Sequence, residues 1–265
     1  TTCSLRNWHM LRHATVFLLA LLITPAITAL AQDKDASPEV QYQQLVNQFR
    51  TAQMELSKAY RAAKTPAEQL ALRKKMSTIG VDYTPQFMAL AKAHLNDPVA
   101  VDALSWIVTG ASRFGGKEAD EALQLLADHH IKNQKLAVIC ERLRNSSLRG
   151  AIGFLETVLE KSPHHDAQGH ACYSLAYKLK RSAGNTPANL AKAETLFDRL
   201  ATDFADVKTR TSTLGTVATS ELFEIRNLSI GKPAPEILGH DIDGVEFKLS
   251  DYRGQVVVLD FWGHW

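Results

Sequence analysis

The residues whose types and spacing could do chemistry stand near the C-terminus. Asp260 directly follows Val256–Leu259, a β-branched apolar run that is typical of a strand buried on both faces. Phe261, Trp262 and Trp265 then place three aromatic rings close to this carboxylate. Carboxylates are among the side chains that exchange protons in enzymes. Asp260 is therefore the first candidate for chemistry, and the alternative is a carboxylate that caps a strand end in contact with solvent.

The segment upstream predicts how the chain reaches this strand. Pro233 and Pro235 force an extended backbone. Asp243-Gly244 is a tight-turn dipeptide between two short strand-like runs, which predicts a hairpin. Residues 250–254 then predict a polar turn before the apolar strand.

Together these features resemble a known family. Gly231–Gly239, Asp241–Gly254 and the Asp-Phe-Trp pattern at 260–262 are similar to the start of the redoxin families, the TlpA/ResA-like thiol-disulfide oxidoreductases and the AhpC/TSA peroxiredoxins. The resemblance implies a thioredoxin-like α/β domain over 229–265, truncated just before an expected Cys-x-x-Cys pair. It also implies protein thiols or disulfides as substrates, a protein electron donor as partner, and no cofactor.

The resemblance also implies roles for individual residues. Asp260 matches the buried acid that takes the proton of the second, resolving thiol, because the thiolate is the attacking species. Trp262 and Trp265 match the rim around the two thiols, although isolated aromatic residues are more often packing residues. Since the nucleophilic cysteines are expected after Trp265, we expect this chain by itself to be inactive as an oxidoreductase.

Three interpretations of the function stay open at this stage. The Trp-x-x-Trp spacing of Trp262 and Trp265 favours a disulfide reductase, because that spacing leads into Cys-x-x-Cys in the family. The second interpretation is a peroxiredoxin-like antioxidant, which carries Pro and Thr ahead of one peroxidatic cysteine. The third is an interaction scaffold whose helical region is the main functional part and whose redoxin unit is accessory.

The N-terminus predicts export. Ala14–Ala31 holds no charged residue, follows Arg12, and ends in an Ala-x-Ala box at 29–31. This pattern is typical of a secretory signal peptide over 1–31, starting at Thr1 or at Met10. The alternative is an uncleaved membrane anchor. Both place the remainder outside the cytoplasm, in the periplasm or secreted, with membrane contact through this segment.

The charge balance bears on partners. Cleavage after Ala31 removes Arg6 and Arg12 and no acid, which lowers Lys+Arg from 30 to 28 against 28 Asp+Glu. The mature chain is then formally neutral. A neutral total argues against nucleic acid or an acidic surface as the main partner.

Prolines mark the helical region. All six prolines between 37 and 228 follow a helix-capping residue, and a capping residue with Pro behind it is typical of a helix start. Thr65-x-x-Glu68 adds a capping box. The six pairs are Ser37-Pro38, Thr65-Pro66, Thr84-Pro85, Asp97-Pro98, Ser162-Pro163 and Thr186-Pro187.

These starts separate amphipathic runs and predict an α-helical domain over 37–228. Ala171–Lys180, a turn at Gly184-Asn185 and Leu190–Leu200 resemble a tetratricopeptide-type helix pair. The predicted fold class is mainly α: a helical bundle or TPR-like hairpins, followed by the first β elements of the truncated domain. Such a helical region would bind proteins or dimerise rather than catalyse.

The remaining cysteines and histidines carry weaker signals. Cys140 and Cys172 lie in apolar helical contexts, where a disulfide and buried free thiols both stay open. Adjacent histidines on a helix point about 100° apart, so neighbours rarely bind one ion together. We therefore predict no metal site at His129-His130, His164-His165 or His170.

Overall fold

The computed structural model describes residues 36–110, 117–181, 186–260 and 262–263. The predicted signal segment 1–31, with Met10 and Ala31, lies outside the described residues, as does Trp265. The chain from Ser37 onward forms one compact unit. Within the described ranges, no helix is long and apolar enough to cross a membrane.

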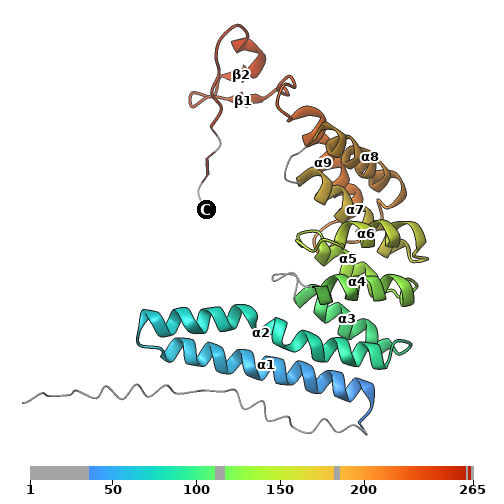
Figure 1. Ribbon diagram of the computed structural model, residues 1–265. Coiled ribbons are helices and arrows are strands. Elements are labelled where there is room, and N and C mark those ends of the chain that lie inside the picture. Colours follow the sequence, from blue (N-terminus) through green and yellow to red (C-terminus); the bar gives the residue numbers. More distant parts are fainter. Residues whose placement is uncertain (1–35, 111–116, 182–185, 261, 264–265) are drawn as a thin grey trace, which may run out of the picture. The chain divides into compact units, whose positions relative to one another are not determined.

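The described chain is mainly helical, with a small β-hairpin near its C-terminal end, as the sequence predicts (Figure 1). The helices run from Pro38 to Asn227, and the two strands follow. Their bounds are α1 Pro38–Ala62, α2 Pro66–Ala93, α3 Pro98–Gly110, α4 Lys117–His129, α5 Leu136–Leu143, α6 Ala151–Lys161, α7 His165–Arg181, α8 Pro187–Asp203 and α9 Leu214–Asn227.

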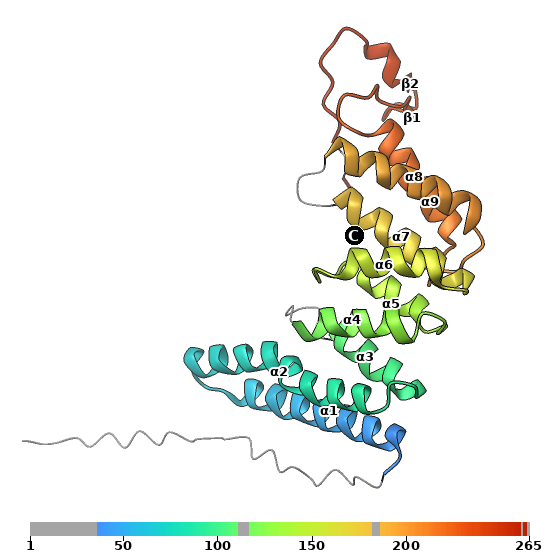
Figure 2. The ribbon, with the colours of Figure 1, turned by 45° about the vertical axis from the view of Figure 1, so that its right-hand side comes forward.

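Helices that are close in sequence pack against one another. Figures 1 and 2 show α1 and α2 side by side as a hairpin, and α2 also packs against α3. Farther along, α7 contacts α5, α6, α8 and α9. The predicted pair of helices is confirmed as α7 against α8, while its turn at Gly184-Asn185 lies outside the described residues.

Most of the predicted helix starts are confirmed. The hydroxyl of Ser37 accepts from the N–H of Val40 at 3.4 Å at the start of α1. Thr65 and Glu68 form the predicted capping box of α2, with each side chain accepting from the other's backbone N–H. The Thr186 side chain caps α8. These side chains satisfy N–H groups that the first helical turn leaves unpaired.

Two predicted starts differ from the structure. Thr84-Pro85 lies inside α2, because the surrounding turns bury Phe87 and Met88 and the Thr84 hydroxyl donates to the Gly80 carbonyl at 3.0 Å. Core packing therefore outweighs the local start signal there. The start after Ser162-Pro163 is delayed, and α7 begins at His165.

The hydrophobic core extends along the helices from Leu45 to Ile225. Near its N-terminal end, the Phe87 ring stacks on Trp106 with ring centroids 3.8 Å apart, and Phe49 meets Trp106 edge-on at 4.9 Å. Deeper along the chain, the Ser174 hydroxyl donates to the Cys140 carbonyl at 2.7 Å and ties α7 to α5. Burial on this scale explains why the helical region dominates the described fold.

Candidate functional site

The hairpin that precedes the Asp-Phe-Trp pattern forms as predicted. β1, Leu238–His240, pairs antiparallel with β2, Glu246–Lys248, with Gly239 opposite Phe247. In the connecting loop, the Asp241 carboxylate accepts from the N–H groups of Asp243 and Val245, both at 2.9 Å. Gly244 has a φ of +80°, a backbone conformation that favours glycine. The Asp-Gly turn signal is thus confirmed.

The polar turn after the hairpin folds back onto the segment before it. Leu249–Tyr252 forms a short 3₁₀ helix, labelled η2, and the Ser250 N–H donates to the Glu236 carboxylate at 3.0 Å. Hydrogen bonds from Ser250 hold the pKa of Glu236 below its usual value. A Cβ at Gly239 would lie 2.9 Å from the Phe247 ring, so a larger residue there would make this ring shift. The lead-in segment is therefore held by its own local contacts.

The apolar run that follows is exposed instead of buried. Val256 and Val258 are 97% and 88% exposed, and residues 256–260 form no strand in the described chain. The expectation of a strand buried on both faces is wrong for the described residues. Its physical reason is that such a strand needs a pairing partner on each edge, whereas β1 and β2 pair with each other.

The candidate site residues share this exposure. Asp260 is exposed, and Trp262 is 81% exposed. Phe261 and Trp265 lie outside the described residues. The burial on which a proton-transfer role of Asp260 depends is therefore not provided by the residues that the structure describes.

The two described cysteines are not nucleophile candidates. Cys140 and Cys172 are free thiols buried in α5 and α7, so no disulfide joins them. Burial raises the pKa of the Cys140 thiol and raises the pKa of Cys172 to about 12. The Cys172 thiol also donates to the Leu196 carbonyl at 3.3 Å. The thiolate is the reactive species, so a raised pKa makes both thiols unreactive. Both side chains therefore act as apolar core residues.

The histidines are engaged separately. His164 contacts the Lys132 carbonyl at 2.7 Å, and His165 contacts the Asp206 carboxylate at 2.9 Å. Desolvation lowers the pKa of His130 and of His170, which favours their neutral forms. Across the described ranges, no group of three or more His, Cys, Asp or Glu side chains is placed to hold a metal ion.

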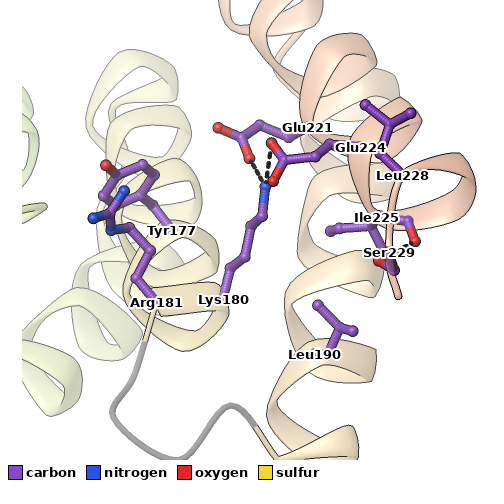
Figure 3. A pocket seen from close by; sticks show the side chains of 9 residues that line it. All are labelled: Tyr177, Lys180, Arg181, Leu190, Glu221, Glu224, Ile225, Leu228 and Ser229. Carbon is purple, nitrogen blue, oxygen red and sulfur yellow. Dashed lines mark hydrogen bonds and ion pairs between the residues drawn. The ribbon is translucent and has the colours of Figure 1, made fainter. Parts of the chain in front are cut away.

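A cavity of about 460 Å³ lies among α7, α8 and α9 (Figure 3). The Lys180 ammonium pairs there with Glu221 at 2.7 Å and Glu224 at 2.8 Å. Burial opposes the charge of Lys180, but the hydrogen bonds to both glutamates outweigh it and raise the pKa of Lys180. The sequence analysis missed this cavity. Its lining comprises Tyr177, Lys180, Arg181, Leu190, Glu221, Glu224, Ile225, Leu228 and Ser229.

Comparison with known proteins finds partial matches to one kind of enzyme. The thiol-disulfide oxidoreductase ResA of Geobacillus kaustophilus is 42% identical over 50 residues, which cover 19% of this chain and 29% of the relative. ResA of Geobacillus thermodenitrificans is 45% identical over 38 residues, covering 14% of this chain and 22% of the relative. No protein-family model and no solved structure matches the chain.

These matches bear on a part of the molecule. The chain spans between 22% and 29% of the length of these curated relatives. Within that span, identity of 42–45% shows partial homology to these thiol-disulfide oxidoreductases.

Proposed function

We propose that this chain is part of an exported thiol-disulfide oxidoreductase. The segment 229–265 would open its thioredoxin-like domain, and the helical domain 37–228 would precede it. The observation that carries the proposal is the lead-in hairpin followed by the Val-Val-Val-Leu-Asp-Phe-Trp pattern, supported by the partial matches to ResA. Those relatives are named disulfide oxidoreductases, which favours this function over the peroxiredoxin-like alternative.

The proposed chemistry is thiol-disulfide exchange by a Cys-x-x-Cys pair expected after Trp265. The first thiolate attacks a sulfur of the substrate disulfide, which forms a mixed disulfide and releases one substrate thiolate. The second thiol then gives up its proton and attacks the mixed disulfide, which releases the reduced substrate and leaves the pair oxidised. A protein electron donor reduces the pair again.

In this scheme the chain's own residues support the exchange. Asp260 takes the proton of the second thiol, and Trp262 and Trp265 form the rim of the site. Asp260 needs a desolvated position for this role, because an exposed carboxylate is a weak base at neutral pH. We propose that strands paired with Val256–Leu259 supply that burial in the complete domain.

Insulin reduction tests the oxidoreductase proposal. The protein of the complete reading frame is expected to carry Cys-x-x-Cys after Trp265 and to reduce insulin disulfides with dithiothreitol as donor. Asp260→Asn should slow the reaction and change its pH profile, and Cys140→Ser with Cys172→Ser should leave it intact. A reading frame without a cysteine pair, or activity that depends on Cys140 or Cys172, would show the proposal to be wrong.

Mass spectrometry tests the export proposal. Expressed in a bacterial host, the protein is expected outside the cytoplasm with Gln32 as its first residue, because the Ala-x-Ala box precedes that position. Ala31→Lys should block the cleavage, since signal cleavage requires small residues. A cytoplasmic product with an intact N-terminus would contradict the assignment.

A further inference from the structure

The outer part of the α1–α2 hairpin, residues 46–78, differs from the rest of the helical region, and we call it the hairpin arm. The structure describes all of these residues, and none of them is buried, although Leu45 and Ile79 on either side of the arm are. Leu56, Tyr60 and Leu72 are half-buried. The outer surfaces of the two helices are thus open to a partner.

The hairpin arm carries a local positive charge. It holds seven Lys or Arg and two Glu, a formal charge of +5, whereas the chain after Ala31 is neutral in total. Glu68 is already engaged, because its carboxylate accepts from the N–H groups of Lys64 and Thr65 in the capping box. No ion pair that the structure shows among described residues involves a basic residue of the arm. The seven basic residues of the hairpin arm are Arg50, Lys58, Arg61, Lys64, Arg73, Lys74 and Lys75.

Three of these cations share one face of α1 with an apolar side chain. Arg50, Met54, Lys58 and Arg61 follow one another at helical spacings of four, four and three, and all are exposed. Met54 is 56% exposed. We call these four residues the α1 stripe. It contains no acidic residue, and Lys64 continues the positive charge into the turn between the helices.

We propose that the hairpin arm docks on an anionic lipid surface through the α1 stripe. Lys and Arg would pair with lipid phosphates, and Met54 would enter the boundary between headgroups and acyl chains. The formal neutrality of the chain is no objection, because binding responds to the charge near the surface and not to the total.

The position of α1 favours a membrane over other anionic partners. Pro38 begins α1 seven positions after Ala31, the last residue of the apolar segment. In the export proposal that segment directs the chain to the membrane, and it stays attached to the membrane in the uncleaved-anchor alternative. Seven extended residues span at most about 25 Å, so the arm is within reach of a bilayer that holds this segment. Recognition of single-stranded nucleic acid by stacking needs exposed aromatic residues, and the α1 stripe contains none. Duplex DNA also binds basic residues on one face of a helix, so DNA is compared directly with vesicles in the test.

Vesicle flotation tests the proposal on the chain from Gln32 onward. This form lacks the apolar segment, and the described core, from Leu45 to Ile225, lies entirely within it. The vesicles are phosphatidylglycerol with phosphatidylcholine, or phosphatidylcholine alone. We expect binding to the anionic vesicles in 50 mM salt and loss of that binding in 500 mM salt, because salt screens surface charges.

Two triple variants separate local from total charge. Each basic residue near an anionic membrane strengthens binding about fivefold, so Arg50→Gln with Lys58→Gln and Arg61→Gln should weaken binding on the order of 100-fold. The matched control, Lys132→Gln with Lys161→Gln and Lys192→Gln, removes the same charge from exposed positions elsewhere and should weaken it less than about threefold. Circular dichroism verifies that both variants are folded.

Other outcomes would overturn the proposal. Equal binding to both kinds of vesicle, equal losses in the two triple variants, or tighter binding to DNA or to polyglutamate than to the anionic vesicles would each show that the α1 stripe does not recognise lipid. Met54→Ser adds an independent arm, because it removes the apolar contact without changing charge and should weaken vesicle binding several-fold. The assay needs no thiol chemistry, so it can fail or succeed independently of the proposed oxidoreductase function.

Discussion

Burial determines the chemistry of Cys140 and Cys172 at the scale of single residues. An ordinary thiol has a pKa of 9.0, whereas burial raises that of Cys172 to about 12. At pH 8 this difference lowers the thiolate fraction about a thousandfold. The same desolvation acts on Cys140, which is fully buried.

We therefore predict that iodoacetamide alkylates the native chain from Gln32 onward at least 100-fold more slowly than the same chain in 6 M guanidinium. Both sites should react once unfolded, as counted by mass spectrometry. Fast labelling of Cys140 or Cys172 in the native protein would mean that α5 and α7 open readily, and the thiols would then regain a possible redox role.

His170 predicts a pH dependence of stability. Desolvation lowers its pKa below the ordinary value of 6.5, so the unfolded chain binds the proton first as the pH falls. Stability from this residue is therefore constant above about pH 6.5 and decreases below it. The free energy of unfolding is measured in urea for wild type and for His170→Gln. From pH 7.5 to pH 5, wild type should lose more stability than the variant. A difference that is independent of pH would contradict the assignment.

At the scale of elements, Pro66 and Pro85 show how position decides the effect of a residue. Pro66 is the first residue of α2, where the missing N–H has no intrahelical partner to lose. Pro85 lies inside the same helix, where the missing N–H breaks the bond to the Val81 carbonyl. The same residue type is thus neutral at one place and costly at the other.

We predict that Pro85→Ala raises the free energy of unfolding by about 2 kcal/mol, because it restores a helical hydrogen bond and improves helix propensity. Pro66→Ala is the matched control and should change it by less than about 0.5 kcal/mol. Guanidinium denaturation with circular dichroism measures both. Destabilisation by Pro85→Ala would indicate that α2 needs a bend there to pack on α3.

The same contrast explains what could be predicted from sequence. Helix caps and the Asp243-Gly244 turn depend on neighbours within four positions, so their signals are visible locally. Thr84-Pro85 carries the same signal, but the burial of Phe87 decides the outcome, and burial depends on distant helices. The Lys180–Glu221 pair in the cavity joins residues 41 positions apart, and no local pattern announces it.

The candidate site divides in the same way. The residue types at 256–262 follow a recognisable pattern, and that pattern is enough to suggest a redoxin. The burial proposed for Asp260 is different, because it would depend on strands paired with Val256–Leu259, and the described chain leaves this run exposed. Residue identity could thus be read from sequence, whereas the environment that the proposed role of Asp260 requires could not.

At the scale of the whole molecule, the helices and the C-terminal run should differ in protection. Helical amides buried around α7 are hydrogen-bonded within a packed core, whereas Val256–Asp260 form no strand in the described chain. We predict that amide hydrogen exchange is slow in α7 and complete within seconds at Val256–Asp260. Protection of the two regions to a similar degree would show that the C-terminal run is ordered by contacts beyond those described.

The packing order of the helices also has a kinetic consequence. Because most contacts join helices that are neighbours in sequence, or nearly so, the mean loop that must close during folding is short. Small helical proteins with low contact order fold within microseconds to milliseconds, and folding within a second is expected here. A ribosome adds about 5–20 residues per second. Folding of the helical region is therefore expected to be much faster than delivery of the chain, so the residues after Gly231 would seek their partners next to a completed structure.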